Sequence, residues 1–257
     1  MAESTKVVVV TGASSGIGAA LARALAGAGH TLVLAARREV ELARLAEELA
    51  AESLVVPTDV TARAQVERLR DRALERFGRV DVWVNNAGRA ITRPVLELTD
   101  DDIDEMIAVN VKSALYGMQA IVPHFVERGT GHLVNVSSFL GRVPLATPRS
   151  AYSAAKSALN TLTANLRVDL RGHPGVHVSL VMPGMVSTGF ASSALGGTIA
   201  PSPGAAPMGV QTAEEVAAAI ARLIEHPVAE IYTNPASEAI ARRYYEDVGA
   251  FEAGGPP

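Results

Sequence analysis

Short runs of apolar and β-branched residues alternate with longer segments rich in alanine, leucine, arginine and glutamate along most of this chain. Most of the short runs are apolar throughout, as expected of strands that are covered on both faces. This alternation predicts an α/β fold, a doubly wound parallel sheet of about seven strands with helices on both faces. The expected strands cover residues 6–10, 31–35, 54–56, 80–84, 131–136, 176–181 and 230–232. The expected helices cover residues 17–28, 40–51, 62–77, 100–127, 152–171 and 213–225.

Residues 1–257 are expected to form one domain, because this length fits a single α/β sheet and no linker or repeat interrupts the alternation. Thr99 and Thr212 stand where helix N-caps are expected. Residues 191–209 are rich in Gly, Pro, Ala and Ser, which indicates a long loop, and we expect a lid over about residues 187–210. A last helix is expected over about residues 236–248, with a frayed end after it.

The composition excludes several classes of function. The net charge of −4 is mixed along the chain, so the sequence has no electrostatic footprint for nucleic acid. The absence of cysteine excludes disulfides, thiolate metal ligands and cysteine catalysis. The six histidines share no face with metal-ligand spacing, so we expect no metal site. No apolar run approaches the roughly 18 residues of a membrane span, so we expect a cytoplasmic protein that does not enter a membrane.

A glycine-rich turn, TGASSGIG over residues 11–18, joins the first expected strand to the first expected helix. Glycine permits a tight turn and lets backbone N–H groups approach a pyrophosphate at the start of the helix. The turn does not end in Gly-Lys-Ser/Thr, which counts against a nucleotide-hydrolysing P-loop. Its position between a strand and a helix favours a Rossmann-like dinucleotide site. The candidate cofactor-binding residues of the turn are Gly12, Ser14, Ser15, Gly16, Ile17 and Gly18.

The residues after the second expected strand indicate which dinucleotide would bind. An NAD site has an acidic residue about 20 residues after the turn, which accepts the ribose 2′-hydroxyl. This chain has Arg37 and Arg38 there, and its first acid is Glu39. The two arginines could pair with a 2′-phosphate, or they could be solvated residues that open a helix. The missing acid and the two bases favour NADP(H) over NAD(H).

A tyrosine and a lysine four residues apart, Tyr152 and Lys156, form a second candidate site. The chain has three lysines against twenty arginines, so a lysine kept at this spacing indicates a need for an ammonium group. The two side chains share a face if the segment is helical. A nearby ammonium stabilises a phenolate and brings the pKa of a tyrosine toward the range useful for general acid–base catalysis. Chance placement of the pair is the alternative interpretation.

With the glycine turn and the Tyr152/Lys156 pair together, the chain resembles the classical short-chain dehydrogenase/reductase family. Further motifs fit the family in order and spacing as far as residue 188. The resemblance implies that Asn110 and Ser138 join Tyr152 and Lys156 as catalytic residues. The alternatives are Ser137 in place of Ser138, and a purely structural role for Asn110. Besides Tyr152 and Lys156, the implied cofactor contacts after the turn are Asp59, Val60, Asn86, Ala87, Gly88, Pro183, Gly184, Val186 and Thr188.

The resemblance implies an NADP-dependent oxidoreductase that transfers a hydride between the nicotinamide and a carbonyl or secondary alcohol. We expect a ketone or aldehyde reductase with a mainly apolar small-molecule substrate. This expectation depends on apolar residues that flank the catalytic positions, namely Phe139, Leu140, Val143, Leu145, Met185 and Val186. The alternatives are an oxidative alcohol, steroid or sugar dehydrogenase, a nucleotide-sugar epimerase and a non-catalytic NADP-binding regulator. An epimerase usually has a larger C-terminal domain, and a regulator is expected to have lost Tyr152 or Lys156.

Three arginines near these motifs could bind an anionic substrate, although surface arginine is the commoner explanation; they are Arg89, Arg142 and Arg149. The resemblance also implies a homodimer or homotetramer, with contacts through the helices expected at residues 100–127 and 152–171. Residues 231–235 and the last expected helix replace the family's closing strand with its two glycines. A dimer is therefore the firmer expectation.

Overall fold

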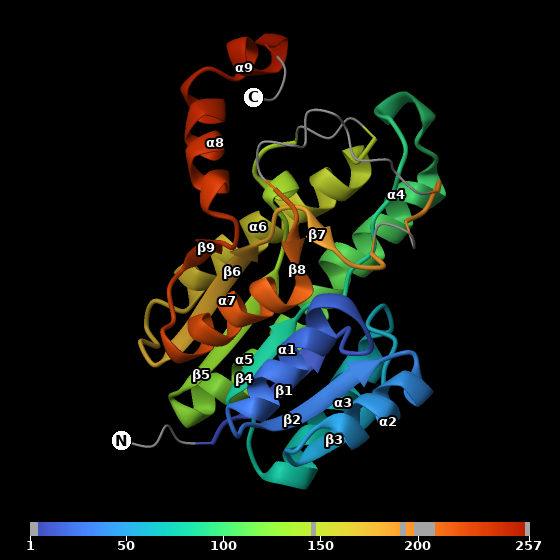
Figure 1. The fold of residues 1–257 in the computed structure, drawn as a ribbon. Coiled ribbons are helices and arrows are strands. Elements are labelled where there is room, and N and C mark those ends of the chain that lie inside the picture. Colours follow the sequence, from blue (N-terminus) through green and yellow to red (C-terminus); the bar gives the residue numbers. More distant parts are fainter. Residues whose placement is uncertain (1–4, 145–147, 191–193, 198–208, 255–257) are drawn as a thin grey trace.

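The computed structural model describes residues 5–144, 148–190, 194–197 and 209–254 (Figure 1). Its main sheet has seven strands in the order β3-β2-β1-β4-β5-β6-β9, and every neighbouring pair is parallel. This arrangement confirms the predicted doubly wound α/β fold. The strands are β1 (Val7–Thr11), β2 (Thr31–Ala36), β3 (Ser53–Pro57), β4 (Val82–Asn85), β5 (Gly131–Val136), β6 (Val176–Met182) and β9 (Glu230–Tyr232).

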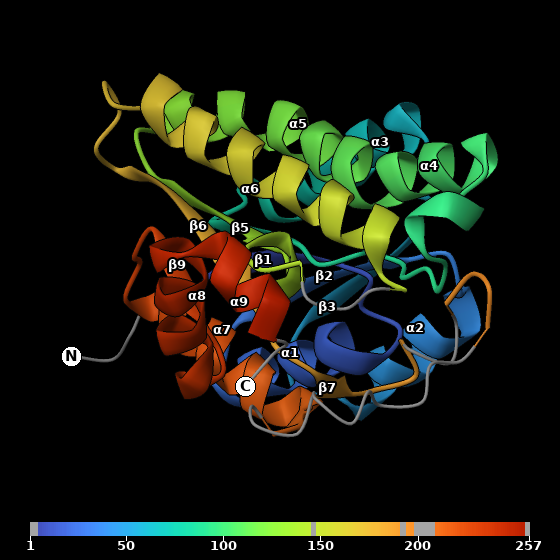
Figure 2. The ribbon, with the colours of Figure 1, turned by 90° about the horizontal axis from the view of Figure 1, so that it is seen from above.

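Helices cover both faces of the sheet because alternate residues of the strands point to opposite sides. In β1, Val8 and Val10 belong to one apolar core cluster, and Val7 and Val9 belong to the other. Figure 2 shows the two helical layers with the sheet between them. One layer has α1 (Gly16–Gly27), α2 (Glu39–Glu48) and α7 (Ala213–Glu225). The other has α3 (Arg63–Phe77), α4 (Asp100–Ile107), α5 (Ser113–Arg128) and α6 (Ser150–Asp169).

The strand order reverses between β1 and β4, because the chain builds the sheet outward in one direction through β2 and β3 and then in the other from β4. In open parallel sheets, ligands bind at the carboxyl ends of the strands at such a switch point. The glycine turn follows β1, and Asn86, Ala87 and Gly88 follow β4. The topology therefore brings two of the sequence motifs to the same crevice.

The helix expected over residues 100–127 is interrupted. α4 ends at Ile107, the five-residue π-helical turn η2 (Ala108–Lys112) follows, and α5 begins at Ser113. Asn110 lies in the middle of this turn. Its side-chain amide donates to the carbonyl of Met106 at 3.2 Å, and the Ser113 hydroxyl donates to the carbonyl of Val109. π-turns inside helices occur frequently at functional sites, and apolar periodicity does not reveal the extra residue.

The C-terminal segment also differs from its prediction. In place of one helix over about 236–248, α8 (Pro235–Glu246) and α9 (Val248–Gly254) are separated by Asp247, whose backbone is extended. Asp247 begins α9 because its carboxylate accepts from the N–H of Ala250 at 2.9 Å. Tyr244 and Phe251 then pack edge-to-face with ring centroids 5.6 Å apart. Figure 1 shows α8 and α9 beyond β9, away from the glycine turn.

Part of the expected lid lies outside the described residues, namely 191–193 and 198–208. The two ends of that stretch meet in a small parallel pair, in which β7 (Val186–Ser187) contacts β8 (Gln211–Thr212). The two predicted helix caps are confirmed, because Thr99 and Thr212 each form a capping box with the residue three positions later. Among the described residues, none of the helices has the length and apolarity needed to cross a membrane.

Candidate active site

The glycine turn after β1 has a backbone that side chains would not permit. Gly12 and Gly16 have φ values of +67° and +54°, in the left-handed region that favours glycine. At Gly18 the constraint is space, because a Cβ there would lie 2.3 Å from the carbonyl oxygen of Gly12 and 2.7 Å from the amide nitrogen of Asn86. The Ser15 side chain precedes α1 without capping it. A closely approaching backbone at an uncapped helix start is the geometry that binds phosphate groups.

Thr11 and Asn86 fasten this turn to the end of β4. The Asn86 side chain donates to the carbonyl of Thr11 at 2.9 Å, and the Thr11 hydroxyl accepts from the N–H groups of Asn86 and Ala87 at 3.0 and 3.2 Å. Ala87 also lies against Gly12, where a Cβ would be 2.9 Å from its Cα. Thr11 was not among the predicted site residues; its only sequence signal is a hydroxyl at the point where strand meets turn.

Arg38 lies beside the glycine turn. Its guanidinium donates to the hydroxyl of Ser14 at 3.0 and 3.2 Å and to the carbonyl of Ser14 at 3.3 Å. Arg37 lies close enough to Asp59 to act on its charge. Burial alone would raise the pKa of Asp59, but hydrogen bonds from Thr61 and the positive charge of Arg37 hold it below the usual value. The two arginines therefore follow β2, with Arg38 beside the serine of the turn and Arg37 near Asp59.

The carboxyl end of β5 and the first turns of α6 bring Ser138, Tyr152 and Lys156 together, and all three are buried. Burial raises the pKa of Tyr152 to about 12, against a hydrogen bond with Ser138 and the charge of Arg149, which both lower it. The Tyr152 phenol is therefore protonated at neutral pH. Ser138 also accepts from the N–H of Leu140 at 3.1 Å, which fixes its hydroxyl at the start of the short 3-10 helix η3 (Phe139–Gly141).

Lys156 is 3% exposed and its ammonium donates to the carbonyl of Val136 at 3.0 Å. The ammonium lies 5.7 Å from the centre of the Tyr152 ring. Burial lowers the pKa of Lys156 to about 8, so the group stays mostly charged at neutral pH. The spacing of four residues brings the two groups together as predicted. The expected lowering of the Tyr152 pKa is not found, because burial of the phenol raises that pKa to about 12.

Asn110 reaches the same place from η2. Its amide donates to the carbonyl of Arg89 at 3.0 Å and accepts from the Arg89 N–H at 3.2 Å. A Cβ on Gly88 would lie 3.0 Å from the Asn110 oxygen and 3.5 Å from the Lys156 ammonium. Asn110 therefore holds the segment after β4 in place, which is a structural role, and Gly88 lies between Asn110 and Lys156.

The residues after β6 complete the crevice. The carbonyl of Pro183 accepts from the N–H of Phe139 at 2.8 Å, which joins this segment to the Ser138 region. Thr188 lies above the glycine turn, with its Cβ 3.5 Å from a Cβ placed on Gly16. Gly184 lies against Asn234, and Val186 forms part of β7. The side chains of Ile17 and Val60 are partly buried and pack against the two core clusters.

The apolar residues that flank the catalytic positions in sequence lie in different parts of the structure. Phe139 and Val143 are buried in a cluster under α8 and α9 together with Tyr244 and Phe251. Leu140 packs beside Tyr152, Met185 is partly exposed, and Leu145 lies outside the described residues. The expectation that Phe139 and Val143 meet a substrate is therefore wrong, because the C-terminal helices cover them.

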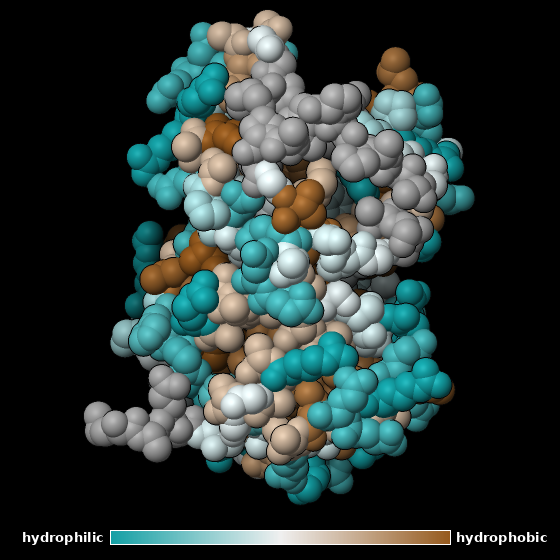
Figure 3. All heavy atoms as spheres, viewed as in Figure 1, coloured by the Kyte–Doolittle hydropathy of each residue, from teal (hydrophilic) through white to brown (hydrophobic). Residues whose placement is uncertain are grey.

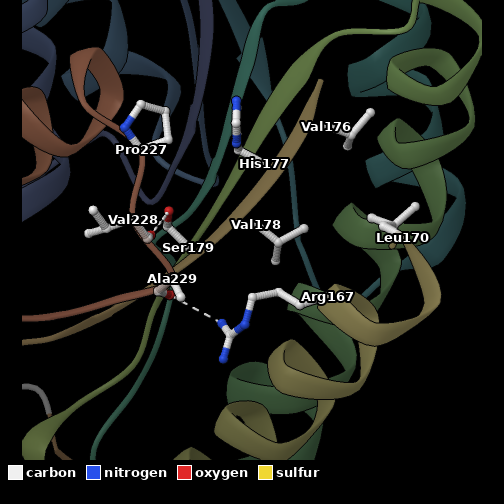
Figure 4. A pocket seen from close by; sticks show the side chains of 9 residues that line it. All are labelled: Arg167, Leu170, Val176, His177, Val178, Ser179, Pro227, Val228 and Ala229. Atoms are coloured by element: carbon white, nitrogen blue, oxygen red, sulfur yellow. Dashed lines mark hydrogen bonds between the residues drawn. The ribbon is translucent and has the colours of Figure 1, made fainter. Parts of the chain in front are cut away.

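A separate surface pocket of about 260 Å³ lies at the amino end of β6, at the opposite end of this strand from the candidate active site. Figure 4 shows its lining residues from β6, α6 and the segment before β9, with Arg167 donating to the carbonyl of Ala229 at 3.1 Å. Among the described residues, no group of three or more histidine and acidic side chains could hold a metal ion.

The strand order and the glycine turn place the chain among Rossmann-type α/β proteins. More particularly, it belongs to the short chain dehydrogenase family, whose model matches residues 6–196. An uncharacterized oxidoreductase of Staphylococcus aureus (strain N315) is 40% identical over 189 residues, which are 73% of this chain and 81% of that protein.

Two solved structures are similar to this chain along most of its length. A short-chain dehydrogenase/reductase from Burkholderia phymatum, in complex with NAD, is 34% identical with a TM-score of 0.86, over 97% of this chain and 96% of its own. An alcohol dehydrogenase from the archaeon Thermococcus sibiricus, complexed with 5-hydroxy-NADP, is 32% identical with a TM-score of 0.78, over 89% of this chain and 96% of its own. The family and the fold class that the sequence predicted are confirmed.

Replacing Lys156 with methionine is expected to stabilise the cofactor-free protein at pH 7. The folded-state pKa of about 8 lies below the unfolded value of about 10.4, so the buried charge costs roughly 3 kcal/mol at neutral pH. Loss of the hydrogen bond to Val136 removes about 1 kcal/mol of this gain. The unfolded state binds more protons between these two pKa values, so the advantage of the variant shrinks as pH rises across that window.

Urea denaturation of wild type and Lys156→Met at pH 7 and at pH 10.5 measures this difference. Lys112→Met is the matched control, because Lys112 is exposed on η2. A Lys156→Met variant that is less stable than wild type at pH 7 would show that the ammonium contributes more to the fold than its burial costs.

Proposed function

We propose that this chain is an NADP(H)-dependent oxidoreductase that interconverts a carbonyl compound and an alcohol, working as a ketone or aldehyde reductase. The observation that carries the proposal is the convergence of Ser138, Tyr152 and Lys156 at the crevice where the glycine turn lies. The phenol is protonated at neutral pH, and a buried ammonium lies beside it to stabilise the phenolate that proton donation would leave. The NAD and 5-hydroxy-NADP in the two related structures support a nicotinamide cofactor.

The residues of the crevice fit such a cofactor. Gly12 and Gly18 let the turn pack against itself and against Asn86 and Ala87 without a side chain in the way, and such a tight turn at the start of a helix would present backbone N–H groups to a pyrophosphate. Arg38 and Ser14 would hold a 2′-phosphate, and Asp59 would stand near the adenine. Asn86, Ala87 and Gly88 line one wall and Pro183, Gly184, Val186 and Thr188 the other. When bound, the cofactor would supply the hydride for the carbonyl carbon.

The chain's own residues would orient the carbonyl group and supply the proton. The Ser138 hydroxyl would donate a hydrogen bond to the carbonyl oxygen and orient it. Tyr152 would transfer its phenolic proton to that oxygen as the carbon is reduced. The Lys156 ammonium would stabilise the phenolate that Tyr152 leaves behind. Asn110 would support the reaction by holding the Gly88–Arg89 segment against Lys156.

The same residues can run the reaction in the oxidative direction, with Tyr152 as the base. A regulator without catalytic activity is the alternative from a different class. We incubate the protein with a panel of ketones and aldehydes and with NADPH, and then with the corresponding alcohols and NADP⁺. Turnover in the first assay supports the reductase, and faster turnover in the second supports the dehydrogenase. Binding of NADPH without any turnover would favour the regulator.

Replacing Arg38 with glutamine is expected to raise the KM for NADPH by about 10- to 100-fold, because a charge-assisted bond to phosphate contributes about 1.5–3 kcal/mol. The KM for NADH should change by less than about threefold, since NADH lacks the 2′-phosphate. Steady-state rates with both cofactors give the ratio. Arg44→Gln is the matched control, because Arg44 is an exposed arginine of α2. A wild-type preference for NADH, or equal losses for both cofactors, would contradict the assignment.

Assembly as a homodimer or homotetramer and a cytoplasmic location are further parts of this proposal. The family resemblance places the dimer contact on the helices expected at residues 100–127 and 152–171, which correspond to α4, α5 and α6. The face shown in Figure 3, which carries α1, α2 and α7, has hydrophobic side chains scattered among hydrophilic ones. This mixed surface is typical of a face that meets solvent.

A further inference from the structure

Arg149 lies at the N-terminus of α6, the helix that contains the candidate proton donor Tyr152. It is the N-cap residue of α6, three positions before Tyr152. Its carbonyl accepts from the N–H of Ser153, and its backbone forms an isolated bridge with Arg93. Only two residues separate Arg149 from Tyr152, so both side chains lie at the beginning of α6.

The Arg149 side chain is half-buried and lacks a partner among the described residues. Its Nη1 atom is inaccessible to solvent and makes no hydrogen bond there. A guanidinium cannot discard its charge, so an unsatisfied buried N–H of this group costs more than a neutral one. Burial also lowers the pKa of Arg149, because removal from water disfavours the charged guanidinium. Among the described residues, no acceptor reaches that nitrogen.

The other arginines of this region differ from Arg149, because each is neutralised by a carboxylate. Arg89 pairs with Glu105, and Arg142 pairs with Glu230. Arg93, the bridge partner of Arg149, lies 3.4 Å from a carboxylate oxygen of Asp102. Among the described residues, Arg149 forms no such pair. Of the three arginines that the sequence analysis named for anion binding, Arg149 is therefore the one without a carboxylate partner among the described residues.

The charge of Arg149 acts on the candidate proton donor. Against the burial that raises the pKa of Tyr152, the charge of Arg149 is one of the two influences that lower it. The guanidinium is therefore within electrostatic reach of the phenolic oxygen. The Phe190 ring also packs against Tyr152, with the two ring centroids 5.8 Å apart. A substrate whose carbonyl oxygen meets Tyr152 and Ser138 would therefore lie near both an arginine and an aromatic ring.

We propose that Arg149 binds a carboxylate of the substrate, so that the preferred substrates are short oxo acids whose carboxylate lies one or two carbons from the carbonyl. This inference rests on the function proposed above and deepens it. The planar fork of an arginine matches the two oxygens of a carboxylate. The short spacing follows from the neighbouring positions of Arg149 and Tyr152. The carbonyl carbon is reduced at the expense of NADPH, its oxygen takes the Tyr152 proton, and the carboxylate leaves unchanged as part of a hydroxy acid.

The test compares acids with their own neutral esters. 2-Oxobutanoate and acetoacetate are each assayed with NADPH beside their methyl esters, using wild type, Arg149→Met and Arg149→Lys. Methionine keeps much of the stem and removes the charge. For wild type, kcat/KM is expected to be higher for the acids. The acid-to-ester ratio of kcat/KM is expected to fall about 10- to 100-fold in Arg149→Met and to recover in part in Arg149→Lys.

A binding measurement provides a readout apart from turnover. With NADP⁺ present, 2-hydroxybutanoate should raise the Tm of wild type, and this rise should be lost in Arg149→Met. The Tm of each variant without ligand reports whether it folds. Wild-type enzyme that reduces the esters but prefers them to the acids would overturn this inference and leave the proposed function standing. An unchanged acid-to-ester ratio in Arg149→Met would also overturn it. Failure to reduce any carbonyl compound would overturn both.

Discussion

Tyr152→Phe is expected to lower kcat for carbonyl reduction by about 10²- to 10⁴-fold, the usual contribution of general acid–base catalysis. The substitution removes only the hydroxyl. The ring that packs against Phe190 and the apolar cluster around it remains, so the fold should persist. Burial raises the pKa of Tyr152 to about 12, so the wild-type phenol is protonated at neutral pH and relies on the nearby Lys156 ammonium to stabilise the phenolate when it donates. Steady-state NADPH oxidation with a reactive ketone measures the loss.

Tyr116→Phe is the matched control for this experiment. Tyr116 lies on α5, outside the crevice. The guanidinium of Arg63 stacks over its ring, 4.4 Å from the ring centroid. Its variant should keep the activity of wild type within about twofold. If Tyr152→Phe keeps the wild-type rate at saturating ketone, then Tyr152 is not the proton donor.

Gly18→Ala is expected to weaken NADPH binding by about 100-fold and to destabilise the fold by about 1–3 kcal/mol. The added Cβ would lie 2.3 Å from the Gly12 carbonyl oxygen, so the backbone of the turn must move. Overpacking of this kind costs about 1–3 kcal/mol, and a displacement of about 1 Å at a site can cost about 10²-fold. Fluorescence titration with NADPH and urea denaturation measure the two effects.

Gly27→Ala is the control on the same helix. Gly27 is the last residue of α1, and a Cβ there would have no neighbour within 4 Å. Alanine has the higher helix propensity, so this variant should be as stable as wild type or more stable by up to about 1 kcal/mol. Equal NADPH affinity in Gly18→Ala and Gly27→Ala would mean that the cofactor does not approach the turn.

The sheet and the glycine turn could be predicted from sequence because their causes are local. A run such as Val7–Thr11 can be buried on both faces only in a covered parallel sheet, and the glycines after it mark a close backbone approach. The helix starts at Thr99 and Thr212 were equally readable, since a capping box involves residues three apart. The Tyr152/Lys156 pair followed from helical spacing alone.

Other features depend on contacts between distant segments, and periodicity does not record them. The π-turn around Asn110 is set by side chains that satisfy backbone carbonyls. The break at Asp247 lets Phe251 fold back on Tyr244, and this packing covers Phe139 and Val143. Arg149 looked like Arg89 and Arg142 in sequence. Only the structure shows that the other two have carboxylate partners, which lie 16 and 88 residues away along the chain.

Under the proposed function, hydride transfer to a carbonyl takes place at the crevice where Tyr152, Ser138 and Lys156 meet the glycine turn. The most direct measurement uses NADPH that carries deuterium at C4 of the nicotinamide, in separate samples for the two faces of the ring. Wild-type protein is incubated with a carbonyl compound, and the alcohol is analysed by mass spectrometry. We expect one deuterium on the carbinol carbon from only one of the two labelled cofactors, and about 10²-fold or greater slowing in Tyr152→Phe. Protein that binds NADPH and yields no labelled alcohol from any carbonyl compound would contradict the claim.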